Sequence, residues 1–394
     1  MKAVARLMLM LLPPALLSMP AQAQDADLTP PPRDAVLAVM TQEASAEVAR
    51  RTGPEAHRQP RRAPVADGAS APFLVAAMEL SLAADVPAVG DYVARAAAKG
   101  PLPDEVDERL YERDGRPGRL KPLEQRLGDA LPDLVWRPAP KRLTWPGCGA
   151  LFLAPAAYAR LSVLTGDAKY LQAMDAAWWE SYDRLWDADA HLYACGRRTR
   201  AVTTALPGGE GSVMAGLARV LEIMPADFPS RPRYMALYHD MAARVIARQG
   251  ADGVWRQYPR DLADAEVLDT ALETYALAFG INHGLLDRRT YLPRVLEAWA
   301  ALGGHVPHDA AGPFILTGLQ IMTLGDPATP LPVPVIVHDP LKTASPEAER
   351  PAGTVERPGT ASEARARTSA SDPITDDPSY RSPKTIISRP ASPR

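Results

Sequence analysis

Hydrophobic residues recur at intervals of three and four along much of this chain. One such run comprises Tyr170, Leu171, Met174, Trp178, Tyr182 and Leu185. A second comprises Tyr234, Leu237, Met241, Val245 and Ile246. These intervals place apolar side chains along one face of an α-helix. Because the strict alternation typical of half-buried strands is nearly absent, the pattern predicts an all-α fold.

The helical segments also repeat. Three of them begin with a turn followed by an aromatic and an apolar residue, at Tyr170, Tyr234 and Tyr291. After each helix comes a turn containing Asp or Gly and then a second aromatic residue, at Tyr193, Trp255 and Phe314. Each unit is therefore expected to be a helical hairpin. A hairpin cannot bury its apolar face alone, so the copies must stack, either in a row as a solenoid or in a closed ring. The periodicity leaves both arrangements open.

The two ends of the chain differ in composition from the helical region. Residues 1–23 combine Lys2 and Arg6 with an apolar run and a small-residue cleavage site, which predicts a secretory signal peptide. We expect residues 24–71 to hold a first helix and a polar loop, and residues 72–331 to form the main helical domain. Residues 332–394 are rich in Pro, Ser, Thr and charge, and are expected to be a disordered tail that specifies no partner.

The remaining composition narrows the class of protein. The chain has 394 residues, 46% of them hydrophobic, and a formal net charge of -3. That balance does not favour nucleic-acid binding. No stretch after the signal peptide is apolar enough to span a membrane. No catalytic triad, phosphate-binding glycine loop or metal-ligand spacing was found, so neither a cofactor nor a metal is predicted. We therefore expect a periplasmic or secreted protein.

Export affects how the two cysteines are interpreted. Cys148 and Cys195 are the only cysteines of the chain. In an oxidising compartment they could form a single disulfide. Two buried free thiols remain the alternative.

Several segments of the chain follow a recognisable pattern, and they include Cys148-Gly-Ala-Leu-Phe-Leu-Ala-Pro155, Leu164-Thr-Gly-Asp-Ala-Lys-Tyr-Leu171, Gly253-Val-Trp-Arg256 and Tyr275-Ala-Leu-Ala-Phe-Gly-Ile-Asn282. These segments resemble the unsaturated glycuronyl and rhamnogalacturonyl hydrolases, glycoside hydrolase families 88 and 105. The resemblance implies an (α/α)6 barrel of six helical hairpins. It also implies oligosaccharide substrates that end in an unsaturated uronic acid. In these families an aspartate protonates the enol ether and activates the water that hydrates the double bond, which is general acid–base catalysis.

The chain differs from this family at the positions that carry the family's catalytic and substrate-binding residues. Gly149 stands where the family has its catalytic aspartate, and glycine carries no proton donor. The family's Trp-x-Arg-Gly-Asn-Gly-Trp segment corresponds to residues 206–212, which lack the arginine and both tryptophans. Of the family's Glu-Thr-Ser segment only Glu266 remains. Loss of a general acid alone lowers a rate by roughly 10²–10⁴.

Four residues remain as candidates for the site. Glu210 is a candidate displaced acid, and the alternative is a carboxylate at a helix start that is favoured by the helix dipole. Glu266 is a second candidate acid with the same alternative. Trp255 and Arg256 are candidate substrate-binding residues, because an arginine fork suits a uronate carboxylate. Alternatively, Arg256 pairs with a surface acid such as Asp261 or Asp264.

Two functions follow from these residues. The first is an exported hydrolase of this kind with reduced or altered activity on unsaturated uronyl oligosaccharides. The second is a catalytically inactive carbohydrate-binding or scaffold protein on the same barrel.

Overall fold

The computed structural model describes most of the helical region. The described residues are 29–53, 71–99, 102–131, 143, 145, 147–195, 209–256, 263–303, 306–307 and 310–325, with only the backbone described at 263–266. The expected signal peptide, most of the polar loop and the tail lie outside these residues. The chain divides into two units, Met1–Val337 and His338–Arg394, and the second lies wholly outside the described part.

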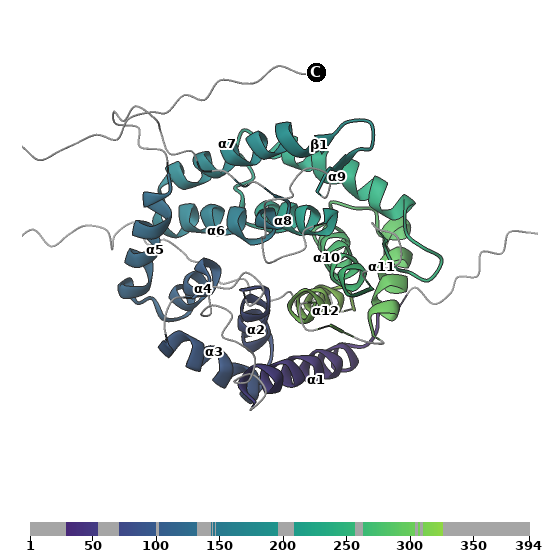
Figure 1. Ribbon diagram of the computed structural model, residues 1–394, viewed down its shortest axis with the longest axis horizontal. Coiled ribbons are helices and arrows are strands. Elements are labelled where there is room, and N and C mark those ends of the chain that lie inside the picture. Colours follow the sequence, from purple (N-terminus) through teal and green to yellow (C-terminus); the bar gives the residue numbers. More distant parts are fainter. Residues whose placement is uncertain are drawn as a thin grey trace, which may run out of the picture. The chain divides into compact units, whose positions relative to one another are not determined.

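Twelve helices in the described part alternate between an outer and an inner layer (Figure 1). The outer helices are α1 (Arg33–Thr52), α3 (Pro87–Lys99), α5 (Pro117–Asp129), α7 (Ala168–Leu185), α9 (Arg231–Ala247) and α11 (Arg288–Leu302). The inner helices are α2 (Ala71–Ala83), α4 (Asp104–Asp114), α6 (Ala150–Thr165), α8 (Glu210–Ile223), α10 (Ala263–Asn282) and α12 (Ala311–Gly325). The predicted all-α class is confirmed.

The inner helices form a closed ring. Each inner helix packs on the next one along the chain from α2 to α12, and α12 packs in turn on α2. Helix α12 also packs on α1, so the last helix of the domain pairs with the first. This closure excludes the solenoid and confirms the predicted barrel. Helix α1, which was expected ahead of the main domain, is therefore one of the outer helices of the barrel.

Local signals explain where the helices end and begin. Gly166 follows α6 with a φ of 73°, a left-handed conformation that glycine adopts at no steric cost and that commonly ends a helix. The next residue, Asp167, caps α7 by accepting a hydrogen bond from the backbone N–H of Lys169 at 3.0 Å. Two consecutive residues thus stop one helix and start the next, which produces a tight hairpin.

The two layers differ in how apolar they are. Helices α8 and α12 are buried along almost their whole length, as inner helices covered on all sides must be. Outer helices such as α9 bury one face and expose the other. Inner helices α6 and α8 approach so closely at Gly216 that a β-carbon there would overlap the carbonyl of Leu151. None of the described helices has the length and apolar content that crossing a membrane would require.

A short antiparallel hairpin follows α7. Its strands are β1 (Trp186–Asp187) and β2 (Leu192–Tyr193), with Trp186 opposite Tyr193. Asp187 builds the turn, because its carboxylate accepts hydrogen bonds from the backbone N–H groups of Asp189 and Ala190, each at 3.1 Å. Figure 1 shows this hairpin at the outer edge of the ring, near α7 and α9.

Candidate active site

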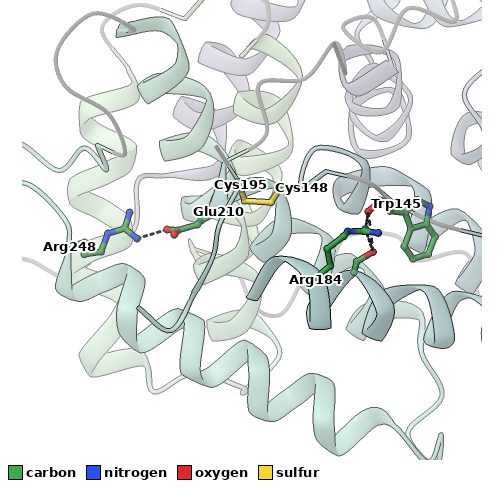
Figure 2. Close-up of a disulfide and its surroundings, with 7 residues drawn as sticks. Trp145, Cys148, Arg184, Cys195, Glu210 and Arg248 are labelled. Carbon is green, nitrogen blue, oxygen red and sulfur yellow. Dashed lines mark hydrogen bonds and ion pairs between the residues drawn. A yellow bond between two sulfur atoms is a disulfide. The ribbon is translucent and has the colours of Figure 1, made fainter. Parts of the chain in front are cut away.

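The start of α6 holds the position where the resemblance places a catalytic aspartate. Gly149 is the residue before α6 and is buried. It offers no side chain at this point, so an acid for the reaction would have to come from another position. The preceding Cys148 forms a disulfide with Cys195, with the two Cα atoms 5.6 Å apart (Figure 2). The two cysteines are 47 residues apart in the sequence. Their disulfide links the start of α6 to the segment that follows the β1–β2 hairpin.

Trp145 is held in place by α7. Its backbone carbonyl accepts hydrogen bonds from Arg184 at 2.6 Å and from the Ser181 hydroxyl at 3.1 Å (Figure 2). The Trp145 ring is buried and meets the ring of Tyr158 edge-on, with the centroids 6.3 Å apart. This tryptophan therefore anchors the chain before α6 through its backbone and its packing.

Glu210 begins α8 and is almost fully buried. Its carboxylate forms an ion pair with Arg248, the residue that follows α9 (Figure 2). Burial raises the pKa of Glu210, whereas the charges of Arg248 and Arg244 act in the opposite direction. Glu210 therefore lies at a helix start, as its alternative interpretation expected, and it also has an ion-pair partner that the sequence did not indicate.

Two further carboxyl groups lie beside Glu210, and they were not predicted from the sequence. Asp269 packs directly on Gly209, whose backbone N–H donates to it, and a β-carbon at residue 209 would overlap the carboxylate. Burial and the neighbouring Glu210 raise the pKa of Asp269 to about 7. Glu273, one turn further along α10, has no exposed surface. Burial, together with Asp269 and Glu210, raises its pKa well above the usual range.

We call Glu210, Asp269, Glu273 and Arg248 the carboxyl cluster. Within the described residues, neither oxygen of Glu273 and only one oxygen of Asp269 has a hydrogen-bond partner. Among the described residues, Arg248 pairs with only one of these three neighbouring carboxyl groups, Glu210, which favours protonation of the other two. A sequence signal did exist, because Asp269 and Glu273 are acids four residues apart, and therefore on one face, in a helix rich in Ala and Leu.

A second set of buried charges links the inner helices to one another. Arg219 of α8 pairs with Glu105 of α4, and Arg160 of α6 pairs with Glu112 of α4 at 3.0 Å. Arg109 of α4 also pairs with Glu79 of α2 at 2.6 Å and with Glu112 at 2.9 Å. We call this set the inner-helix network; it comprises Glu79, Glu105, Glu108, Arg109, Glu112, Arg160 and Arg219. These residues were not singled out from the sequence.

Of the remaining candidates, Trp255 and Arg256 have other partners, and the side chain of Glu266 cannot be described. Trp255 has no exposed surface, and its indole N–H donates to the carbonyl of Val245 at 2.8 Å, which makes it a core residue. Arg256 is exposed and pairs with Asp252 at 2.9 Å, an acid that was not among the partners expected for it. Glu266 lies in the first turn of α10, but its side chain falls outside the described residues. Within the described part, no group of three His, Cys, Asp or Glu residues is arranged to hold a metal ion.

Comparison with known proteins identifies the relatives of this chain. Residues 129–323 match the model of Glycosyl Hydrolase Family 88. This confirms the predicted resemblance. The matched region runs from the end of α5 into α12, and therefore contains Gly149 and the whole carboxyl cluster.

Two curated relatives are unsaturated 3S-rhamnoglycuronyl hydrolases. The protein of Formosa agariphila is 34% identical over 215 residues, which cover 48% of this chain and 56% of that protein. The protein of an Alteromonas species is 31% identical over 182 residues, which cover 43% of each chain. This chain thus matches only about half the length of these relatives.

Solved structures show the same barrel. A glycosyl hydrolase family 88 protein from Bacteroides vulgatus superposes with a TM-score of 0.57 at 16% identity, covering 75% of this chain and all of that one. A possible member of family GH105 from Salmonella enterica superposes with a TM-score of 0.56 at 13% identity, covering 73% of this chain and 94% of that one. The six-hairpin helical barrel is therefore the fold of this chain.

Proposed function

We propose that this protein is an exported hydrolase-like protein of the family 88 and 105 kind that acts on unsaturated uronyl oligosaccharides with strongly reduced activity. The substrate class is supported by two curated relatives that are named as hydrolases of an unsaturated rhamnoglycuronyl group. The observation that carries the proposal of reduced activity is Gly149. It is a buried residue without a side chain at the place where the resemblance puts the catalytic acid.

The carboxyl cluster supplies the candidate replacements for that acid. A general acid works best when its pKa lies near the working pH, because it is then often protonated and still releases its proton readily. Asp269, with a pKa of about 7, fits this requirement. Glu210 also has a raised pKa and lies at the start of an inner helix. Both carboxyl groups are nearly buried, which limits contact with a substrate and agrees with weak turnover.

A second candidate function is carbohydrate binding without catalysis. The observation that favours it is the ion pair between Glu210 and Arg248, which occupies the carboxylate in a structural role. In this second proposal the barrel retains the sugar-binding surface and has lost the proton donor.

One assay separates the two functions. The ultraviolet absorbance of an unsaturated uronyl disaccharide disappears on hydration, so its decay in the presence of the purified protein measures turnover. Residual turnover that falls at least tenfold in Glu210→Gln, Glu266→Gln or Asp269→Asn supports the weak hydrolase and identifies the donor. Absence of turnover, together with a thermal shift caused by the same disaccharide, supports the binding protein. Absence of both turnover and binding contradicts the two proposals alike. Arg289→Gln, on the exposed side of α11, is the matched control.

Export is the second part of the proposal. The disulfide between Cys148 and Cys195 supports it, because structural disulfides persist in oxidising compartments. Expression of the full chain in a Gram-negative host, followed by mass spectrometry of the periplasmic fraction, tests the expected cleavage after Ala23. An uncleaved protein that stays in the cytoplasm contradicts export without affecting the proposed chemistry.

A further inference from the structure

The β1–β2 hairpin lies near α7 and α9 in the outer layer of the barrel (Figure 1). Aromatic and charged side chains of these elements contact one another there. We call this cluster the aromatic ledge and define it by Tyr182, Trp186, His191, Arg233 and Asp240. Gly149 and Glu210, by contrast, belong to the starts of inner helices. None of the chemistry considered above uses the ledge.

Two aromatic rings form its centre. Tyr182 and Trp186 are stacked, with the ring centroids 5.2 Å apart and an angle of 20° between the planes. Both side chains are only half-buried, whereas Tyr193, which meets them edge-on from below at 6.1 Å and 5.5 Å, is buried. The buried tyrosine therefore supports a pair of rings that keeps part of its surface open to solvent. Flat, half-exposed rings of this kind can pack against the C–H face of a sugar.

Arg233 adds an oriented positive charge. Its guanidinium carbon lies 3.5 Å from the centre of the Trp179 ring and 5.7 Å from that of Tyr182. The side chain is exposed, and no described residue forms a hydrogen bond or an ion pair with the guanidinium. Stacking on a ring fixes the plane of an arginine and leaves its N–H edge available, which is the geometry that binds a carboxylate in a bidentate manner.

The hairpin completes the ledge with a constrained polar pair. His191 has a φ of 55° and is the one non-glycine residue with positive φ in the described part of the chain. Its Nδ1 lies 2.8 Å from a carboxylate oxygen of Asp240 on α9, and the two side chains are 55% and 45% exposed. A left-handed conformation in a non-glycine residue is unfavourable and often marks a functional position. Here it holds an exposed imidazole–carboxylate pair beside Trp186, whose ring centroid lies 6.3 Å from that of His191.

We propose that the aromatic ledge is an accessory binding site for a uronic acid residue of a saccharide chain. The carboxylate binds the free edge of Arg233, the sugar ring packs on Trp186 and Tyr182, and the His191–Asp240 pair exchanges hydrogen bonds with hydroxyl groups. Asp183 and Asp240 act electrostatically on Tyr182, and Asp240 is already bonded to His191. The preference for an acidic sugar follows from Arg233, the one cation of the ledge, which lacks an anionic partner among the described residues.

The ligand class matches the proposed substrates, but the ledge does not require the chain to be an active hydrolase. A saturated galacturonate trisaccharide is therefore the appropriate probe, because it lacks the double bond on which the proposed reaction depends. Tryptophan fluorescence and chemical-shift changes of the Trp186 indole N–H report binding at the ledge. Turnover of the unsaturated disaccharide is measured separately.

The expected result is saturable binding of the galacturonate trisaccharide, weakened at least about fivefold by Arg233→Gln, as expected for loss of a charge-assisted pair. Trp186→Ala, which lacks the reporter ring and is therefore measured by calorimetry, should weaken it further, while the exposed variant Arg289→Gln should leave it unchanged. All three variants should melt close to the parent temperature. A neutral galactose trisaccharide should bind at least fivefold more weakly, and a sulfated galactose trisaccharide reveals whether sulfate can replace the carboxylate.

Several outcomes would overturn the inference. One is the absence of a Trp186 response to any of the acidic sugars. Equal binding of the acidic and neutral trisaccharides, or of the parent and Arg233→Gln, would also exclude the proposed site. If the protein binds the trisaccharide but does not turn over the disaccharide, the result contradicts the proposed hydrolase function and not the proposed binding site at the ledge.

Discussion

The carboxyl cluster and the inner-helix network are both buried charge clusters, but they balance their charges differently. In the network, Arg109, Arg160 and Arg219 each pair with at least one glutamate from another part of the inner ring. In the cluster, among the described residues, only Glu210 has an ion pair, with Arg248, and Asp269 and Glu273 have none. The network is the better-matched set, with three arginines for four glutamates, and burial raises the pKa of only one residue described in it, Glu108, well above the usual range. An unmatched set takes up protons, so its stability should depend on pH.

The largest expected effect comes from breaking the matched set. Arg219→Met leaves Glu105 buried without its partner, and removal of one member of a buried ion pair costs about 3–5 kcal/mol. Urea unfolding at pH 7 measures this loss. Arg294→Met, which removes an exposed pair with Glu297, should change stability by less than about 0.5 kcal/mol. Similar losses in the two variants would show that the inner-helix network contributes no more than a surface pair.

The corresponding change in the carboxyl cluster should be smaller and should depend on pH. Arg248→Met removes the one cation among the described residues that pairs with Glu210. At pH 8 the loss should reach about 2–3 kcal/mol, because an unpaired buried carboxylate remains. At pH 5 it should fall to about 1 kcal/mol, since the carboxyl groups can be neutralised by protonation. Urea unfolding at the two pH values measures the difference, and an equal loss at both would contradict proton uptake by the cluster.

Asp269 should carry much of this pH dependence. Its pKa is about 7 in the folded protein and about 3.9 in an unfolded chain, so the folded state binds more protons between these values. The stability contributed by this group is complete below about pH 4 and is lost as the pH rises through about 7. Asp269→Asn should therefore flatten the decrease in stability between pH 5 and pH 7.5, by about 2–3 kcal/mol, and melting temperatures across this range measure the change.

The matched control for Asp269 is an aspartate with the opposite shift. Asp252 is exposed, and its hydrogen bond with Arg256 lowers its pKa to about 2. Asp252→Asn should leave the slope between pH 5 and pH 7.5 as it is in the parent. If Asp269→Asn retained the parent slope, the pH dependence would have to arise elsewhere in the protein.

The smallest expected effect comes from removing one buried glutamate, and it should change stability in opposite directions in the carboxyl cluster and in the inner-helix network. Glu273 is fully buried, and its oxygens have no hydrogen-bond partner among the described residues. Glu273→Met should therefore stabilise the protein at pH 8 by about 1 kcal/mol, because it removes a polar group that is costly to bury. Glu105→Met should destabilise it, since Arg219 would lose its partner. Equal signs in urea unfolding would remove the distinction between the two clusters.

Much of the fold could be predicted from the sequence, because its signals are local. The four-residue spacing of Tyr170, Met174 and Trp178 predicted one face of a helix, and this segment forms α7. The Gly166–Asp167 pair ends α6 and begins α7 through contacts within four residues of each other. The repeat indicated hairpins but not their closure, which depends on the packing of α12 on α1 and α2.

The candidate site was predicted less completely. Glu210 was identified from its position at a helix start, whereas its partners Arg248 and Asp269 lie on other helices and carry no motif. Trp255 was expected at a sugar and lies in the core, because a conspicuous aromatic residue after a turn has the same sequence pattern in either role. The contacts of a side chain with distant helices could not be read from one sequence.

By itself, then, the sequence determined the helices, their ends and the resemblance to glycoside hydrolase families 88 and 105, including the glycine at residue 149. Only the tertiary structure joined Cys148 to Cys195, closed the ring, and gathered Glu210, Arg248, Asp269 and Glu273 into one buried cluster. The physical reason is range. Helix formation depends on neighbours within about one turn, whereas the charge state of a buried carboxyl group depends on every helix packed around it.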